Sequence, residues 1–165
     1  MKKTPNRGMK MIGWIALILT ALILASVAWR IDDWGRDFVQ NTAELEPDAQ
    51  RPELRPVELN RSLDQASRDV QAWAEQQANW QWISTDSSPT RSETTVKLTR
   101  TTPVFKFVDD ITVTLRPIDG EEKVQLRARS QSRVGKGDLG QNPRNLIELV
   151  RGLSDRGASD GHPRG

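Results

Sequence analysis

Side chains that could take part in chemistry gather in two stretches of the second half of the sequence. The first contains Asp109 and Asp110, and the second, residues 130–144 (SQSRVGKGDLGQNPR), combines glycines, hydroxyls and charges. Ser130 or Ser132 could act as a nucleophile only with a base within hydrogen-bonding distance. The chain has no cysteine and a single histidine, placed in a polar, glycine-rich C-terminal end. A serine hydrolase would therefore need a lysine or a carboxylate as its base, and this is the alternative interpretation.

The stretch 130–144 is also a candidate anion-binding loop. It contains Gly135, Gly137 and Gly140, and it carries the basic residues Arg133, Lys136 and Arg144. Glycines allow successive backbone N–H groups to surround an anion, and the N-terminus of a following helix would favour negative charge. The spacing is not that of a P-loop, because no Gly-Lys-Ser or Gly-Lys-Thr is present. The favoured alternative is a structural connection in which Asp138 accepts hydrogen bonds from neighbouring N–H groups.

The carboxylates Asp109 and Asp110 are poorly placed for one metal ion. Adjacent residues of a strand point to opposite faces of a sheet, so the two side chains would not converge. We expect one of them to accept hydrogen bonds from loop backbone or to pair with Arg129 or Arg133. No metal site and no cofactor are predicted.

Helical and strand patterns must position these residues. Ser62 and Gln65 form a capping-box pattern, and apolar residues then recur at helical spacing to about Ala78. Four stretches have the β-branched, aromatic or alternating pattern of strands: 80–85, 94–101, 111–116 and 124–129. Asp119-Gly120 predicts a hairpin between the last two strands. The pattern predicts one domain over residues 61–153.

A final helix follows the glycine-containing stretch. Asn142 is a suitable N-cap, with Pro143 at the first helical position, and apolar residues continue to Leu153. We expect a disordered tail over residues 154–165. The fold class is therefore α+β, a small two-layer domain in the order helix, four antiparallel strands, helix, with both helices on the apolar face of the sheet.

The N-terminal region predicts a membrane anchor. Residues 12–29, from Ile12 to Trp29, carry no charge and would form about 27 Å of helix. Residues 1–11 are basic without an acidic residue, which predicts a cytoplasmic N-terminus. The alternative is a cleaved signal peptide ending near Ala28. Either way, residues 30–60 form an extended lead-in, and the domain lies on the periplasmic side of the inner membrane.

The charge balance argues against nucleic acid as a partner. The chain has 24 basic and 22 acidic side chains, and four of the basic ones precede the apolar segment. The exported part is therefore close to neutral, without the strongly basic surface of a nucleic-acid-binding domain.

Two motifs resemble those of a known family. The segments FVDD, residues 107–110, and RSQSRVGKGDLGQN, residues 129–142, are similar to the paired signature of the family catalogued as domain of unknown function 1499. The similarity spans about residues 41–153. The positions that match the motifs are Phe107, Asp109, Asp110, Arg129, Ser130, Ser132, Arg133, Gly135, Asp138, Gly140 and Asn142.

The resemblance implies one patch of side chains and no established activity. Family members are similar in being bacterial or chloroplast proteins, often with an N-terminal hydrophobic segment. The start of the similar region, residues 41–45, lacks the serine-rich or cysteine-containing sequence associated with many members. Together the patterns predict a non-enzymatic envelope module that binds a protein or an anionic ligand through residues 130–144, with Arg144 added to the patch.

Overall fold

The structure is a computed structural model that describes residues 7–30, 41–90, 92–135 and 137–160. Its elements, in chain order, are α1 (Arg7–Arg30), β1 (Thr42–Glu44), the 3-10 helix η1 (Pro52–Leu54), β2 (Val57–Leu59), α3 (Leu63–Gln76), β3 (Trp80–Ser87), β4 (Thr94–Thr101), β5 (Val108–Pro117), β6 (Val124–Ser132) and α4 (Gln141–Asp160).

The sheet is antiparallel throughout the described strands. Its order is β1-β6-β5-β4-β3, and β2 pairs with β6 as well. The α+β class and the antiparallel sheet are thus confirmed, but the strands number six rather than four. The two additional strands lie in the predicted lead-in and have three residues each. Such short strands show no alternation of their own, because their pairing depends on the exposed edge of β6.

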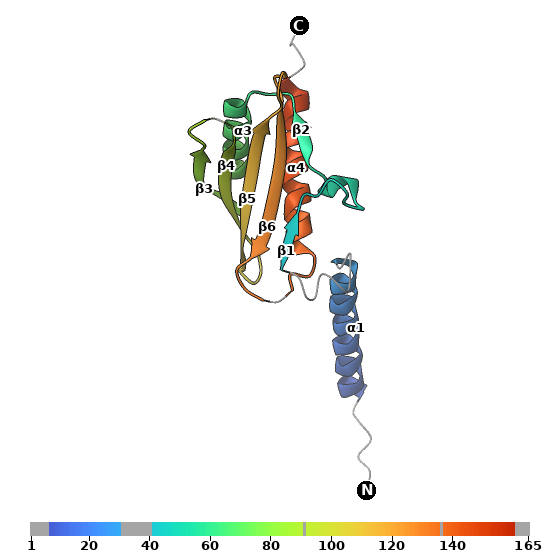
Figure 1. Cartoon of the computed structure of the whole chain (residues 1–165). Coiled ribbons are helices and arrows are strands. Elements are labelled where there is room, and N and C mark those ends of the chain that lie inside the picture. Colours follow the sequence, from blue (N-terminus) through green and yellow to red (C-terminus); the bar gives the residue numbers. More distant parts are fainter. Residues whose placement is uncertain (1–6, 31–40, 91, 136, 161–165) are drawn as a thin grey trace.

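The core lies between the sheet and the helices α3 and α4. Alternate residues of β5 and β6 are buried, among them Val113 and Leu126, and the helices contact this face (Figure 1). The rings of Trp73 and Trp80 meet edge to face with their centroids 4.8 Å apart. Both tryptophans are buried in the core.

Capping residues explain where the two helices begin. Ser62 Oγ accepts a hydrogen bond from the Gln65 backbone N–H at 3.3 Å, so the predicted start of α3 is confirmed. The prediction for α4 was wrong by a few positions, because α4 begins at Gln141 and Asn142 already lies inside its first turn. The side chain of Asn142 is buried and hydrogen-bonded to the sheet instead of capping the helix.

The last helix is longer than the sequence pattern indicated. It continues beyond Leu153 to Asp160, into the segment that we expected to be a disordered tail. Residues 161–165 lie outside the described ranges.

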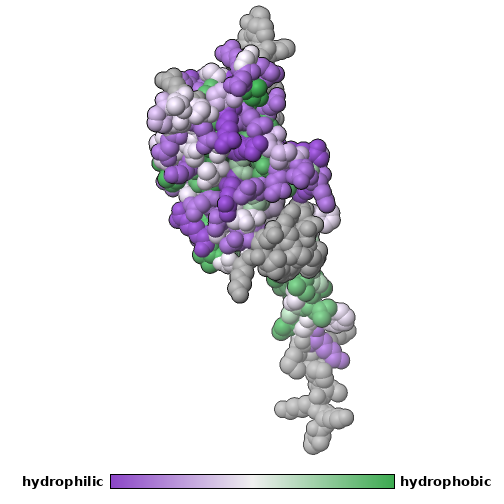
Figure 2. Space-filling view, in the orientation of Figure 1, coloured by the Kyte–Doolittle hydropathy of each residue, from purple (hydrophilic) through white to green (hydrophobic). Residues whose placement is uncertain are grey.

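The predicted anchor falls within α1. The side chains of α1 that can be described are exposed, and Figure 2 shows hydrophobic colour along this helix. Within the described ranges, no helix combines the length and the apolar character needed to cross a membrane. The transmembrane prediction for Ile12–Trp29 is therefore not supported by this structure.

Candidate functional site

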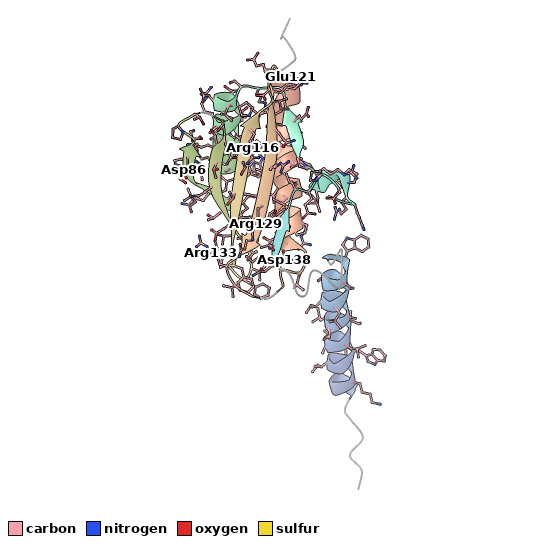
Figure 3. The ribbon with its side chains drawn as sticks, viewed as in Figure 1. Asp86, Arg116, Glu121, Arg129, Arg133 and Asp138 are labelled. Carbon is pink, nitrogen blue, oxygen red and sulfur yellow. The ribbon has the colours of Figure 1, made fainter. Side chains whose placement is uncertain are left out.

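Two connections form one end of the domain, which we call the tip. They are the turn between β4 and β5, residues 102–107, and the loop between β6 and α4, residues 133–140. Because the strands are antiparallel, the end of β4, the start of β5 and the end of β6 meet at this edge. Figure 3 shows Arg133 and Asp138 at the tip, whereas Glu121 lies at the opposite end of the domain.

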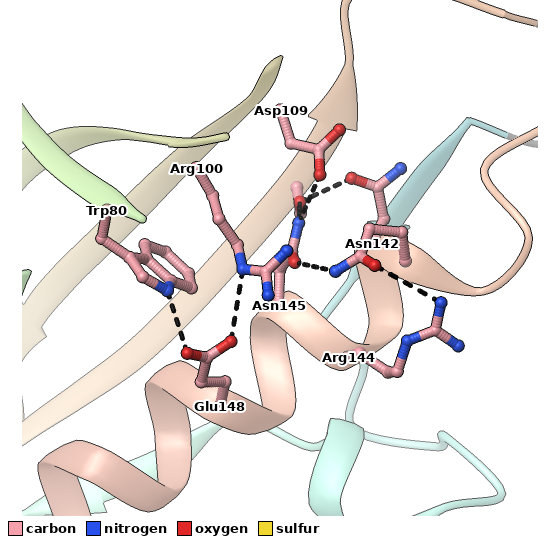
Figure 4. A network of polar contacts seen from close by, with 9 residues as sticks. Trp80, Arg100, Asp109, Asn142, Arg144, Asn145 and Glu148 are labelled. Atoms are coloured by element: carbon pink, nitrogen blue, oxygen red, sulfur yellow. Dashed lines mark hydrogen bonds and ion pairs between the residues drawn. The ribbon is translucent and has the colours of Figure 1, made fainter. Parts of the chain in front are cut away.

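A buried polar network lies beneath the tip. Asp109 Oδ1 accepts a hydrogen bond from Ser132 Oγ at 2.6 Å, and Asp109 Oδ2 accepts one from Asn145 Nδ2 at 2.8 Å. Asn142 Nδ2 donates to Ser132 Oγ at 3.1 Å, and Asn142 Oδ1 accepts from Ser130 Oγ at 2.6 Å. Asn145 Nδ2 also lies 3.1 Å from Ser130 Oγ. These contacts, several of which appear in Figure 4, hold both predicted hydroxyls and the carboxylate in place.

Asn145 was missing from the residues predicted by sequence. It is fully buried on the face of α4 that carries mostly apolar residues. A polar residue among the core positions of an amphipathic helix was the signal that could have found it, because a buried amide requires hydrogen-bond partners.

The two carboxylates do point to opposite faces of the sheet. Asp109 is 1% exposed, whereas the side chain of Asp110 is 50% exposed. Asp110 accepts two hydrogen bonds from Arg133, at 2.7 and 2.9 Å. These hydrogen bonds, followed by the attraction between the charges, raise the pKa of the Arg133 guanidinium above its ordinary value. The predicted pairing of one carboxylate with Arg133 is confirmed.

Arg129 belongs to a different contact. Its Nε lies 3.3 Å from Glu44 Oε1 on β1, and its Nη2 donates to Gln131 at 3.3 Å. The predicted patch is therefore divided between two faces of the sheet. Arg129 and Asp110 lie on the exposed face, while Ser130, Ser132 and Asn142 are buried.

Asp138 organises the connection into α4. Its Oδ1 accepts a hydrogen bond from the Gly140 N–H at 2.9 Å, and its Oδ2 accepts one from the Asn142 N–H at 2.7 Å. Gly135 and Gly140 have positive φ angles of 95° and 72°, which let the loop turn. The N–H groups on which phosphate capture would depend at this helix start are thus bound by the chain's own carboxylate. The structural interpretation of Asp138 is confirmed.

A groove of about 320 Å³ lies between the two connections of the tip. Its lining, which we call the tip groove, consists of Thr102, Pro103, Val104, Phe105, Phe107, Asp109, Ser132, Val134, Gly135, Gly137, Asp138, Leu139, Gln141 and Arg144. Asp109 and Ser132 belong to the buried network, and the rings of Phe105 and Phe107 stack with centroids 5.6 Å apart. Lys136 lies outside the described residues. The groove suits an apolar group with a polar end.

Two residues of the tip have unusual backbone conformations. Lys106 has a φ of 56° and Leu139 has a φ of 52°, although neither is glycine. A leucine in this left-handed region is uncommon and costs conformational energy. Arg144 Nη2 donates to the Leu139 carbonyl at 2.9 Å, which helps to hold the loop in this shape. Leu139 lies on the wall of the tip groove and is 39% exposed.

A second polar cluster joins α4 to the neighbouring strands. Arg100 Nε lies 3.3 Å from Glu148 Oε2, and Trp80 Nε1 donates to Glu148 Oε1 at 3.1 Å. Sequence patterns did not predict this cluster. It lies outside the tip groove lining, and the described residues include no group of three or more His, Cys, Asp or Glu side chains that could hold a metal ion.

The chain enters the domain at the tip. Asn41 Nδ2 donates to the Gly135 carbonyl at 3.1 Å, and the Asn41 carbonyl accepts from Asn142 Nδ2 at 2.7 Å. The Ser132 N–H also donates to the Asn41 carbonyl, at 2.9 Å. The residue that immediately follows the segment 31–40 is therefore fixed beside the glycine-containing loop.

Comparisons with known proteins give one family and distant structural likenesses. A family described as "Protein of unknown function (DUF1499)" matches residues 36–153. No curated protein matches the sequence. The crystal structure of the Saccharomyces cerevisiae Ran-binding protein Mog1p is 9% identical, with a TM-score of 0.37 over 67% of this chain and 76% of that chain. A Mog1 point mutant is also 9% identical, with a TM-score of 0.36 over 67% of this chain and 77% of that chain.

Proposed function

The chain belongs to the family of proteins of unknown function DUF1499, and we propose that it is a membrane-tethered binding module of the bacterial envelope rather than an enzyme. The observation that carries this proposal is the tip groove, an open cavity with mostly apolar walls whose carboxylate and hydroxyl groups are already hydrogen-bonded.

The hydrogen bonds of Ser132 and Asp109 support binding over catalysis. Ser132 Oγ donates to Asp109 and accepts from Asn142, while Asp109 also accepts from Asn145. A serine nucleophile must also be reached by its substrate, whereas Ser132 is buried, with 8% of its surface exposed. The arrangement stabilises the tip without a free nucleophile.

The side chains around the tip groove support a partner with both apolar and anionic character. Phe105, Val134 and Leu139 offer apolar contact area. Lys106 and Arg144 add positive charge near the same rim. An anionic amphiphile or an envelope protein with a similar surface would satisfy both features.

The proposed tether is the segment Ile12–Trp29. The segment carries no charge, and basic residues precede it. The side chains of this segment that the structure describes are exposed, with Trp14 at 66% and Trp29 at 91%, so they are free to contact lipid. We place the N-terminus in the cytoplasm and the domain on the periplasmic side, with the segment retained rather than cleaved.

Carbonate washing of membranes from cells that produce the full chain tests the tether. We expect the protein to stay with the membranes, and a variant without residues 1–30 to be released. Protease should reach the domain only from the periplasmic side. Recovery of a soluble mature protein that starts near Trp29 would contradict the tether.

Photo-crosslinking in intact envelopes tests the groove. A photoreactive residue at Val134 should give crosslinked products, and the same residue at Glu121, at the opposite end of the domain, should give far fewer. Equal yields at the two positions would contradict a binding role for the tip.

The hydrolase alternative rests on the contact between Ser132 and Asp109 at the tip groove. A fluorophosphonate probe distinguishes the two functions, because it labels activated serines. We expect no labelling of the full chain. Labelling that disappears in Ser132→Ala would replace the binding proposal with the hydrolase.

A further inference from the structure

We infer that the tip contacts the lipid bilayer itself, with the apolar rim of the tip groove inserted at the level of the headgroups and the adjoining acyl chains. This inference rests on the proposed membrane tether. It names the partner of the tip groove by its chemistry, an anionic lipid surface.

Exposed apolar side chains are concentrated at the tip. The large hydrophobic residues that are exposed there are Val104 at 78%, Phe105 at 73%, Phe107 at 48%, Val134 at 62% and Leu139 at 39%. Across the described residues of the domain, from position 41 onward, Ile83 is the sole other member of this class. Figure 2 shows hydrophobic colour at this lower end of the domain. A gathering of this kind on an otherwise polar domain marks an interaction surface.

The position of the chain's entry directs this surface toward the membrane. Ten residues, 31–40, separate the end of α1 from Asn41, and they can span at most about 35 Å. Asn41 is hydrogen-bonded to the glycine-containing loop of the tip. The turn at the other end of β5 lies ten strand residues away, or about 33 Å further. A domain that is tethered at its tip can bring that tip to the membrane that holds α1 at any extension of residues 31–40, whereas its far end could reach the membrane only if these residues were almost fully extended.

The apolar side chains are exposed on a turn and on the loop that faces it, and this position suits contact with a broad lipid surface better than contact with a partner that would have to enter a deep cavity. Phe105 and Phe107 stack on each other on the short turn beyond the sheet, and Val134 lies on the facing loop. Lys106 lies between the two phenylalanines in the sequence and is exposed, so its ammonium group can reach lipid phosphates while the rings contact acyl chains. Arg144 lies on the same groove, as does Asp138, whose carboxylate accepts hydrogen bonds from the Gly140 and Asn142 N–H groups. The cations of the tip that we expect to meet lipid phosphates are therefore Lys106 and Arg144.

The absence of cysteine from the sequence allows a direct test on the full chain. Phe105→Cys carries a polarity-sensitive NBD label at the tip, and Glu122→Cys, next to Glu121 in the opposite turn, is the matched control. Both proteins are reconstituted into vesicles of phosphatidylethanolamine and phosphatidylglycerol, with or without doxyl-labelled acyl chains. A third variant, Val134→Cys, repeats the measurement on the other side of the tip groove.

We expect blue-shifted emission and several-fold stronger doxyl quenching for labels at positions 105 and 134 than at position 122. Iodide in the buffer should quench the three labels in the reverse order. Vesicles of phosphatidylcholine alone should weaken the difference, because the cations of the rim lose their anionic partners.

Three results would overturn the inference. If the protein resists carbonate washing but iodide quenches the label at position 105 as strongly as the label at position 122, the tether is supported and the lipid contact is wrong. If the label is shielded from iodide without doxyl quenching, a second copy of the chain covers the tip instead. If the protein washes off the vesicles, both the tether and the lipid contact are wrong.

Discussion

Asn145 on α4 donates a hydrogen bond of 2.8 Å to the carboxylate of Asp109 on β5, so the helix layer and the sheet meet at a buried charge beneath the tip groove. The two residues are 36 positions apart in the sequence. With the hydrogen bond from Ser132 included, each oxygen of the carboxylate accepts a hydrogen bond. The contact therefore links the floor of the groove to both layers of the domain.

Asn145→Ala removes a hydrogen-bond donor to this buried carboxylate. We expect the free energy of unfolding to fall by about 1.5 to 3 kcal/mol, because hydrogen bonds to charged groups are strong and the loss of one leaves a buried charge underbound. Urea unfolding of the full chain in mild detergent measures the change. The exposed amide variant Gln131→Ala is the control and should stay within about 0.5 kcal/mol of the parent. Similar values for the two variants would contradict the structural role of Asn145.

Asp138→Ala removes the acceptor for two backbone N–H groups at the start of α4. Loss of a helix cap typically costs about 1 kcal/mol, and the loss of negative charge near the helix N-terminus adds to the effect. Asp138→Asn keeps one side-chain oxygen as an acceptor and should lose less stability. Thermal unfolding of the three proteins ranks them. The prediction fails if the asparagine variant is the least stable.

Gly152 provides the space in which the indole ring of Trp73 packs. A Cβ atom at position 152 would overlap the ring atoms of Trp73, although alanine has the higher helix propensity. We expect Gly152→Ala to lower the free energy of unfolding by about 1 to 3 kcal/mol, as in other overpacked cores. Trp73→Phe in the same chain should recover part of the loss, because its ring is smaller. Additive effects of the two substitutions would contradict a direct contact.

Leu139 and Leu149 offer a contrast between a strained surface leucine and a core leucine. Leu139 has a φ of 52°, so Leu139→Gly should leave stability unchanged or raise it by up to about 1 kcal/mol. Leu149 is fully buried, and Leu149→Ala should cost about 2 to 5 kcal/mol. Chemical unfolding compares the two variants. A large loss in Leu139→Gly would show that the leucine supports the domain core.

Doxyl quenching in the Leu139→Gly variant tests whether Leu139 contributes to the lipid contact of the tip. The same substitution removes an apolar side chain from the rim, so it should reduce the doxyl quenching of a label at position 105. Gly120→Ala changes a positive-φ glycine in the turn at the opposite end and should leave that quenching unaltered. Equal quenching in the parent and in Leu139→Gly would remove Leu139 from the lipid contact.

Local patterns predicted the central part of the fold. The alternation of Ile111, Val113 and Leu115 with polar residues is a property of one strand, and it indicated both the strand and its buried face. The capping of α3 by Ser62 also depends on residues three positions apart. Asp138 could be predicted as a helix-start carboxylate for the same reason. In each case the partners are close in sequence, so their types and spacing contain the information.

The tertiary structure decided which distant groups meet. The edge of β6 pairs with two three-residue strands, and their own sequences contain no signal for that pairing. Asn142, expected to cap α4, instead bonds to Ser130, Ser132 and the Asn41 carbonyl. These contacts exist because packing of α4 on the sheet buries its polar groups, which then require partners from other elements.

The sequence by itself determined a mixed helix and sheet domain with a candidate site at residues 130–144, where glycines, hydroxyls and charges occur together. Its apolar and polar periodicities and turn residues act over a few positions, and they are enough to define the main elements. Only the tertiary structure decided that this stretch faces the turn 102–107 across a groove, with its hydroxyls bound beneath it and apolar side chains on its rim. That arrangement depends on the antiparallel register of β4, β5 and β6, which brings distant segments to one end of the sheet.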